Sequence, residues 1–399
     1  MLKTPSSTVI GGAGIWTPSA WKIGLDVLNL GQLIRNLFSN SEQGFAYDIN
    51  DLSTLYQDAA GTTPVTAAGQ PVGLMLDKSN GLVVGNNINS NTWVTEGGWT
   101  ILDGKAYHVS GSALGGLYQI NTPVNSKFYK LKFSIIVRSG GLTISRNGTS
   151  VISINSSGTY EIVLKPNQSA NTRLVDFYTN STLFDGEIDL ITITIKELAG
   201  NHAYQTNAAS RPLLQRNATT GAYYLAFDGI DDFLVTNPID FTATDKVSLF
   251  AGVRKLSDAT TGTVVELSPA AYNSVGSFGM FTASSAGSPD FLFRSSGTLF
   301  NASVAVNNNA APKSAVLVGQ AQIGTDTLKI KVNSTQNSSS TDQGTGNYGN
   351  YSLYIGRREG KFFSLNGHLY SLIGVGRLST DAETTNLEKA IAKNVGVTL

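Results

Sequence analysis

The sequence predicts an all-β protein, and three observations support that fold class. Glycine occurs 42 times in 399 residues, charged residues make up only 14% of the chain, and Asn, Ser and Thr are abundant throughout. This mixture is typical of proteins built from many short strands joined by polar turns. Hydrophobic residues still reach 41% and recur in strand-like alternation, so the chain can form a packed core. At this length we expect two or three domains.

Charge and composition exclude several functions. The formal net charge is zero, so nothing attracts the molecule to nucleic acid. The chain has no cysteine, which excludes disulfides, cysteine metal sites and thiol nucleophiles. No window approaches eighteen consecutive apolar residues, and the first residues show no basic flank followed by an apolar run. Neither membrane insertion nor a secretory signal is therefore expected.

Residues 1–44 are expected to form an N-terminal arm with a short amphipathic helix. Its apolar residues recur at spacings of three and four, namely Val27, Leu30, Leu33, Ile34, Leu37 and Phe38. Gly24 and Gly31 weaken the helix. Its apolar face has two interpretations: it docks on its own domain, or it anchors and oligomerises the chain by engaging another subunit. Trp16 and Trp21 could seat the arm in either case.

Residues 45–82 read as the beginning of a β-sandwich. Short apolar pieces alternate with acidic residues, and the sequence GQPVG at 69–73 marks a turn into the apolar stretch 74–76. After residue 82 the character of the sequence changes.

Residues 83–199 alternate strand and turn at short intervals. Candidate strands lie at 105–109, 129–138, 142–146, 150–154, 158–164, 173–178 and 188–197. Seven or more short strands in about 110 residues is the number expected of a compact jelly roll.

Residues 200–399 contain three strand motifs in order. The first is LAFDGIDDFLV at 225–235, the second is YSLYIGR at 351–357, and the third is LNGHLYSLI at 365–373. In the first motif, Asp228 and Gly229 supply the turn of a hairpin.

The chain is expected to close with a C-terminal helix. Thr380 is followed three residues later by Glu383, which is the spacing of a capping box. The pattern predicts a helix that runs through about Lys393.

The three motifs, together with the segment 47–78, resemble concanavalin A-like (LamG-type) lectin/glucanase domains. In that family the counterparts of this segment and of the sequence from residue 201 commonly sit almost side by side, whereas more than a hundred residues separate them here. The resemblance therefore implies a concanavalin A-like sandwich of residues 45–82 and 200–399, interrupted by a second, smaller sandwich at 83–199. The inserted stretch resembles carbohydrate-binding-module or galactose-binding-like folds.

The same resemblance implies a biological setting, because this combination of domains is found in bacteriophage tail and fibre structural proteins. It implies localisation in the virion and contacts with other virion proteins through the N-terminal arm. A homo-oligomer is expected, for which a trimer is the form typical of fibres. The chain would display its domains and bind host-surface polysaccharide; the alternative is a purely architectural decoration or connector protein.

Four aromatic residues near the start of the inserted stretch are the candidate glycan-binding residues: Trp93, Trp99, Tyr107 and Tyr118. Sugar rings have apolar C–H faces that stack on exposed aromatic rings, while polar side chains bond the hydroxyls. Burial in the core is the alternative for each of them, since large aromatic side chains are mostly buried. Trp93 and Trp99 are the better candidates because they bracket a glycine-rich loop.

The acidic motif at 228–232 has a structural and a metal-binding interpretation. Clustered carboxylates could hold calcium, but Asp228 and Gly229 are also what a hairpin turn requires. Strand alternation would point Asp231 and Asp232 to opposite sides, which argues against three converging ligands. We therefore expect a structural turn, with no metal and no cofactor.

No complete catalytic constellation is present, so the chain is not expected to be an enzyme. Laminarinase-type glucanases, which resemble the interrupted domain, carry Glu-x-Asp-x-x-Glu on one strand. Here Glu187 and Asp189 are followed by Thr192 at the third acidic position, and a retaining mechanism needs two carboxylates. Only three histidines occur, each in a different segment. A polysaccharide-degrading enzyme remains the third and weakest hypothesis.

Overall fold

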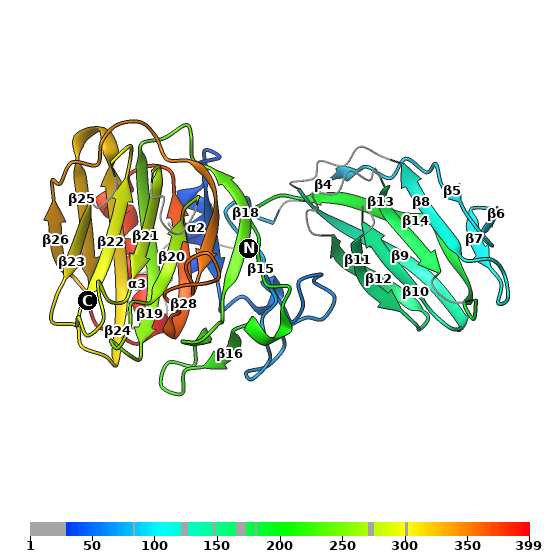
Figure 1. Cartoon of the computed structure of the whole chain (residues 1–399), viewed down its shortest axis with the longest axis horizontal. Helices are drawn as coiled ribbons and strands as arrows, with labels where there is room; N and C mark the ends of the chain where they lie inside the picture. The colour runs from blue at the N-terminus through cyan, green and yellow to red at the C-terminus, as the bar shows by residue number, and fades with distance from the viewer. Residues whose placement is uncertain are drawn as a thin grey trace, which may run out of the picture.

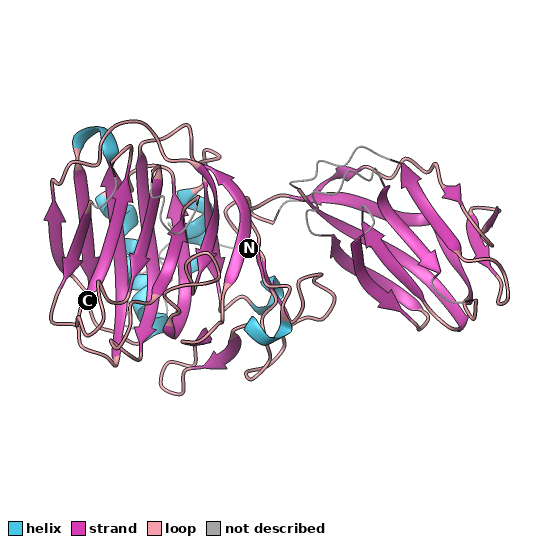
Figure 2. Cartoon of the chain, viewed as in Figure 1, coloured by secondary structure: helices cyan, strands magenta, loops and turns pink. Residues whose placement is uncertain are grey.

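The protein consists of two antiparallel β-sandwiches that lie end to end (Figure 1). The computed structural model describes residues 29–82, 84–120, 127–146, 149–164, 173–179, 182–269, 275–299 and 302–399. The host sandwich contains β1–β3 and β15–β28, and the guest sandwich contains β4–β14. Strands dominate both, and the two α-helices among the described residues belong to the host (Figure 2). The predicted all-β class, with one sandwich interrupted by a smaller one, is confirmed.

The host sandwich packs an eight-stranded sheet against a nine-stranded one. The first has the order β16-β17-β28-β19-β24-β25-β26, with β1 paired to β28. Its strands are β1 (Gly44–Asp48), β16 (Leu213–Arg216), β17 (Tyr223–Asp228), β19 (Lys246–Lys255), β24 (Lys313–Gln322), β25 (Thr327–Val332), β26 (Thr335–Ser339) and β28 (Asn366–Val375). The second has the order β2-β3-β15-β18-β27-β20-β21-β22-β23. Its strands are β2 (Leu55–Tyr56), β3 (Leu74–Met75), β15 (Ala203–Tyr204), β18 (Leu234–Asp240), β20 (Thr263–Leu267), β21 (Ser277–Phe281), β22 (Phe291–Ser296), β23 (Ser303–Val306) and β27 (Asn350–Ile355).

The guest sandwich packs a five-stranded sheet against a six-stranded one. The orders are β11-β10-β13-β8-β5 and β12-β9-β14-β7-β6, with β4 paired to β14. The strands of the first sheet are β5 (Val94–Thr95), β8 (Gly115–Ile120), β10 (Leu142–Arg146), β11 (Thr149–Ile154) and β13 (Arg173–Thr179). Those of the second are β4 (Val84–Asn87), β6 (Thr100–Leu102), β7 (Lys105–His108), β9 (Phe128–Ser139), β12 (Gly158–Leu164) and β14 (Asp185–Leu198). Inward-facing residues such as Phe133, Ile144 and Phe177 fill the space between the sheets.

Strands from both sides of the insertion share the host sheets. β3 pairs with β15 in the register Leu74↔Tyr204, and β1 pairs with β28 over its whole length. The chain before the guest therefore depends on the chain after it for its backbone hydrogen bonds. The segment before the guest therefore completes sheets whose other strands come from the segment after it.

A buried carboxylate ties the exit and return points of the guest together. Asp77 is fully buried; its Oδ1 accepts the N–H groups of Ala46 and Ser79, and its Oδ2 accepts the N–H of Asn201 at 2.7 Å. Asn201 also donates from Nδ2 to Gly44 O at 2.7 Å. Three chain segments that are distant in sequence thus meet at one side chain.

The two sandwiches are packed against each other and are not joined by linkers alone. A hydrophobic cluster crosses the junction, made up of Leu74, Leu76, Phe128, Val163 and Leu198 with Tyr56, Leu82 and Tyr204 at its margin. Val163 N of β12 donates to Ala60 O of the host at 2.8 Å. Gly61 has φ +67°, and a Cβ there would lie 2.9 Å from Val163, so the close approach requires glycine. The guest is therefore seated on the host by apolar burial.

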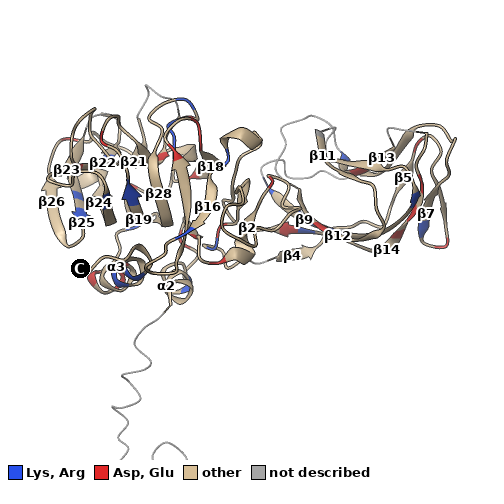
Figure 3. Ribbon diagram, turned by 90° about the horizontal axis from the view of Figure 1, so that it is seen from below, with Lys and Arg blue, Asp and Glu red and all other residues tan. Residues whose placement is uncertain are grey.

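The N-terminal helix docks on its own sandwich, which is the first of the two interpretations given to its apolar face. α2 (Leu30–Leu37) buries its apolar face with α3 (Asp381–Val395) against the eight-stranded sheet, and both helices lie on one side of that sheet (Figure 3). A face covered in this way cannot engage a second subunit. Trp16 and Trp21 lie outside the described residues.

The C-terminal helix begins as predicted. Thr380 and Glu383 form the expected capping box, which is confirmed, and Gly396 ends the helix with φ +79°. Arg377 joins the helix to the arm, because its guanidinium bonds Glu383 at 2.7 Å and Glu42 at 3.1 Å. The Arg377 guanidinium lowers the pKa of Glu383 to about 2.

Acid is expected to weaken the junction through His202. This side chain is fully buried, its Nδ1 accepts the N–H of Asp77 at 2.9 Å, and burial lowers its pKa from 6.5 to about 4. The unfolded chain binds a proton below pH 6.5 whereas the folded chain does not, so stability is complete above that pH and is lost as the pH falls toward 4. Between pH 7.5 and 5.0 this corresponds to about 2 kcal/mol.

Urea unfolding at pH 7.5 and 5.0, for wild type and for His202→Gln, measures this effect. The wild type should lose about 2 kcal/mol more than the variant over that interval. His368, whose pKa burial also lowers to about 4, stays in both proteins and cancels in the difference. Equal losses in the two proteins would show that His202 is not responsible.

Candidate functional site

The four predicted aromatic residues do not converge on one surface. Trp99 is part of the guest core, with only 3% of its surface exposed, and it packs against His108 and Phe184 while Nε1 donates to Gly115 O at 3.3 Å. The prediction of Trp99 as a sugar platform is wrong, because no ring face is open.

Tyr118 is also a poor platform. It lies on β8 and is 8% exposed, with the Arg173 guanidinium 3.7 Å above its ring and its hydroxyl donating to Glu96 at 2.9 Å. The ring face that a sugar would need is occupied, so this prediction is also wrong. Tyr107 lies on β7 in the other sheet, opposite Glu187 of β14, and is half-buried. It therefore shares no surface with Tyr118.

Trp93 is the candidate that lines an open hollow. It is half-buried and packs on Phe177, with ring centroids 5.9 Å apart. The hollow, called the Trp93 hollow below, has a volume of about 600 Å³ and is lined by Asn91, Thr92, Trp93, Ile101, Gly104, Leu190 and Ile191. That volume is in the range of small-ligand sites. β5, β6 and β7 lie at the end of the guest farthest from the host (Figure 1).

The hollow owes its shape to an irregularity in β14. The register of β14 against β9 shifts between Asp189 and Thr194, and Asp189 Oδ1 accepts the N–H of Ile191 at 3.0 Å. This bulge turns Leu190 inward while 76% of Ile191 stays exposed. Gly104, at φ +74° in the β6–β7 turn, lies so close to Ile191 that a Cβ would be 2.6 Å from its Cδ1.

The hollow also holds a polar side chain that is available to a ligand. The side-chain amide of Asn91 makes no hydrogen bond to any residue that the structure describes; only the backbone N–H of Asn91 is bonded, to Asn89 at 3.0 Å. Asn91 is exposed at φ 57°, in the left-handed conformation that Asn tolerates. A free donor and acceptor therefore stands beside a partly open indole ring. Sequence reasoning missed Asn91, Ile101 and Ile191. The first two lie near Trp93 in the sequence, whereas Ile191 comes from β14, far along the chain.

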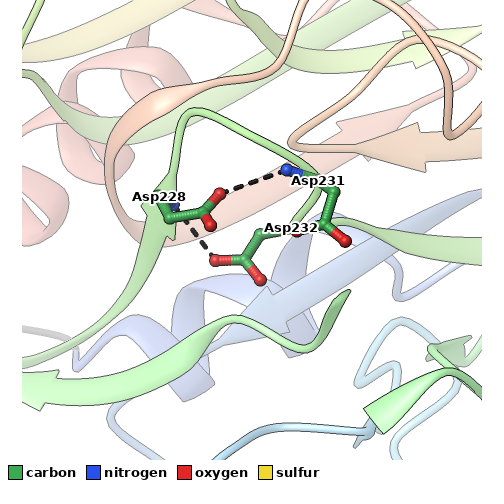
Figure 4. Close-up of side chains that lie close together, drawn as sticks. All are labelled: Asp228, Asp231 and Asp232. Atoms are coloured by element: carbon green, nitrogen blue, oxygen red, sulfur yellow. Dashed lines mark hydrogen bonds between the residues drawn. The ribbon is translucent and has the colours of Figure 1, made fainter. Parts of the chain in front are cut away.

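The acidic motif of the host forms the hydrogen bonds of a turn (Figure 4). Asp228 Oδ1 accepts the N–H groups of Ile230 and Asp231, at 2.7 and 3.2 Å, and Asp232 Oδ2 accepts the N–H of Asp228 at 3.1 Å. Gly229 has φ +80°. Asp228, Gly229, Asp231 and Asp232 therefore all take part in this turn.

The alternation argument about these carboxylates is wrong. One oxygen from each of Asp228, Asp231 and Asp232 lies within 4.8 Å of the others. The three converge because residues 229–233 are a turn, to which strand alternation does not apply. Burial, together with the neighbouring Asp228 carboxylate, raises the pKa of Asp232 to about 6.

Glu187 and Asp189, the catalytic fragment considered above, are held by neighbours. Glu187 bonds Lys105 at 2.8 Å and also bonds Arg138, and the Lys105 ammonium lowers the pKa of this carboxyl. Asp189 holds the bulge of β14. A carboxyl group with a lowered pKa is ionised at neutral pH, so it has no proton to donate as a general acid.

The other ionisable groups are spread over the molecule. Basic and acidic segments are interspersed along both sandwiches (Figure 3). His108 lies in the guest core, His202 at the junction and His368 against Tyr224 in the host, so the three do not meet. Neither described helix is long and apolar enough to span a bilayer.

Fold and site together define an all-β protein of two joined β-sandwiches. No protein-family model and no curated protein matches the chain. Solved structures do match, with low scores. A CBM40 domain of the Ruminococcus gnavus IT-sialidase, bound to alpha2,3 sialyllactose, is 11% identical with a TM-score of 0.29, over 36% of this chain and 83% of that one.

Two further solved structures match with similarly low identity and TM-score. Domains LG4-5 of the mouse laminin alpha1 chain are 13% identical with a TM-score of 0.27, over 71% of this chain and 91% of that one. An arabinofuranosidase complexed with arabinofuranosyl-alpha-1,2-xylobiose is 11% identical with a TM-score of 0.30, over 65% of this chain and 62% of that one. With TM-scores below 0.5, these likenesses assign neither a ligand nor an activity to the chain.

Proposed function

We propose that the chain is a non-enzymatic structural protein of a bacteriophage particle, in its tail, fibre or head-surface apparatus. Its guest sandwich binds glycan on the surface of the host bacterium through the Trp93 hollow. The observation that carries the binding proposal is the hollow itself. It combines a partly open indole ring, aliphatic side chains and the free amide of Asn91 at the far end of the guest. Stacking and hydroxyl recognition both have their groups in place there.

The virion setting is supported by the resemblance of the segment 47–78 and of the three motifs in residues 200–399 to concanavalin A-like (LamG-type) domains, a combination that is found in bacteriophage tail and fibre proteins. Presentation of many copies on one particle would suit the site, because multivalency raises weak sugar binding to a useful avidity. A guest seated on its host by the junction cluster would hold the hollow outward at a fixed position.

A second candidate function is architectural. Leu102 and Ile191 are largely exposed at the same end of the guest, and exposed aliphatic residues of this kind also suit contact with a neighbouring protein. A decoration or connector protein would use that surface without binding sugar.

A glycan array probed with the full chain distinguishes the two functions. Trp93→Ala is expected to lower glycan binding at least tenfold, because it removes the stacking surface. Trp93→Phe, which keeps an aromatic ring against Phe177, should recover part of the binding. Ile230→Ala, a change at an exposed residue of the host, is the control and should bind as wild type does. Absence of binding by well-folded wild type would favour the architectural function.

A further inference from the structure

The Trp93 hollow has no charged side chain among its seven lining residues. The cation nearest along the chain, Lys105, is already paired with Glu187 at 2.8 Å. The carboxylate of Asp189, two residues before Ile191, holds the backbone of the bulge. An anionic sugar entering the hollow would lose water without gaining a cationic partner, which is costly.

Aliphatic side chains form much of the rim. Ile101 and Ile191 are exposed there, and Leu190 lies beneath them. Gly104 allows the β6–β7 turn to approach Ile191 closely, so this exposed side chain is backed by main chain. A methyl group on a sugar could be buried between such side chains, whereas a hydroxyl at the same place would lose its water.

From these features we infer that the hollow selects a neutral sugar that carries a methyl group, as acetamido and 6-deoxy sugars do. The inference rests on the proposed function and names the ligand class of the same site. In it, Trp93 stacks on the sugar ring, the Asn91 amide bonds a hydroxyl or the acetamido group, and the Ile101–Ile191 rim covers the methyl. One buried methyl corresponds to a preference of about fivefold to tenfold over the sugar that lacks it.

Saturation-transfer NMR titration of the full chain with matched methyl glycosides tests this ligand class. One pair is N-acetylglucosamine against glucose, and the other is L-fucose against L-galactose. Glucuronic acid and N-acetylneuraminic acid are the anionic probes. In at least one pair the methyl-bearing sugar should bind about fivefold to tenfold tighter and show its strongest transfer at the methyl protons, while both acids bind more weakly than the neutral sugars.

Two variants connect the selectivity to the rim. Ile191→Ser should bring the affinity ratio within the selective pair close to one. Leu183→Ser changes a side chain of similar exposure that does not line the hollow, and should keep the wild-type ratio.

The outcomes separate this inference from the proposed function. Equal affinities within both pairs, or acids that bind as well as the neutral sugars, would overturn the inference. The proposed glycan site would still stand in that case, provided that Trp93→Ala abolishes glycan binding. If no sugar binds to wild type, or if Trp93→Ala binds as wild type does, the glycan site itself is refuted and the ligand class with it.

Discussion

Replacing Asp77 by alanine is expected to destabilise the folded chain by at least about 3 kcal/mol, because it leaves three buried or partly buried N–H donors without their acceptor. The carboxylate holds the N–H groups of Ala46, Ser79 and Asn201, and the Ser79 hydroxyl at 2.7 Å. An unpaired buried donor costs about 1–3 kcal/mol, and Asp77 is fully buried. The free energy of unfolding, obtained from urea titration, measures the loss.

The same substitution should loosen the connection between the sandwiches. Ala46 belongs to β1, and Asn201 is where the chain returns from the guest, so both lose an anchor. Limited proteolysis of Asp77→Ala should cut near residues 77–82 or 199–202 sooner than it cuts the wild type. Asp342→Ala is the matched control, since Asp342 is an exposed loop carboxylate whose Oδ1 accepts the N–H of Gly344 at 2.7 Å. That variant should stay within about 1 kcal/mol of wild type. A similar loss in both variants would contradict the role given to Asp77.

Asp77→Asn should have an intermediate effect. Burial raises the pKa of Asp77, while the N–H groups of Asn201 and Ser79 act in the opposite direction. A neutral amide therefore avoids the unfavourable burial of charge and keeps one acceptor oxygen, but its NH₂ would meet a donor on the other side. Ranking wild type, Asn and Ala by stability checks that hydrogen bonding, and not charge, is what the site requires.

The interruption of the host sandwich by the guest could be predicted from the sequence, because the motifs that indicate it are local. The segment 47–78 and the motif at 225–235 each contain their own turn residues. In the structure, β3 before the guest pairs with β15 after it. The helix after Thr380 was equally accessible, since a capping box is complete within four residues. Elements specified by nearby residues could be predicted.

Whether each aromatic side chain is buried or exposed could not be predicted, because residues distant in the sequence determine it. Trp99 is buried by Phe184, which lies far along the chain, and Tyr118 is covered by Arg173. A glycine-rich loop around Trp93 and Trp99 indicates a turn but not which ring faces solvent. The docking of α2 likewise depends on partners such as Phe250 and Ile391, more than two hundred residues away.

The bulge that exposes Ile191 did leave a signal in the sequence. In the run 188–195 the inward positions are Ile188 and Leu190, and then Ile193 and Ile195, so the apolar residues change phase. A strand with period two cannot do that without an extra residue. Read in this way, the adjacent pair Leu190–Ile191 predicts a bulge with one apolar residue facing outward.

Breaking the buried ion pair between Glu266 and Arg358 is expected to destabilise the host by about 3–5 kcal/mol, because the remaining charge stays buried and loses its hydrogen-bonded partner. Nε and NH2 of Arg358 each donate to one Glu266 oxygen at 2.7 Å, and both side chains are buried. The guanidinium also lies over the rings of Phe281 and Phe363. Arg358→Met keeps much of that packing while it removes the charge, so its loss of stability reports the unpaired carboxylate.

The pH dependence of the Arg358→Met variant tests this cause. Burial already raises the pKa of Glu266 in the wild type, against the lowering effect of Arg358, and removal of that arginine should raise it further. A carboxyl whose folded pKa lies above its unfolded value takes up a proton on folding, so the variant should recover stability as the pH falls through the raised pKa. The difference from wild type should therefore be smaller at pH 5 than at pH 7.5.

The double variant Glu266→Leu with Arg358→Met completes the cycle. With both charges gone, neither member of the pair is left unpaired, although Arg294 loses the attraction of the Glu266 carboxylate. Replacement of buried ion pairs by apolar side chains is often neutral or stabilising. We expect the double variant to be more stable than Arg358→Met alone by at least about 2 kcal/mol, which is a coupling that independent residues would not show. Additive losses measured by urea unfolding would contradict it and would assign the effect of Arg358 to its contacts with Phe281 and Phe363.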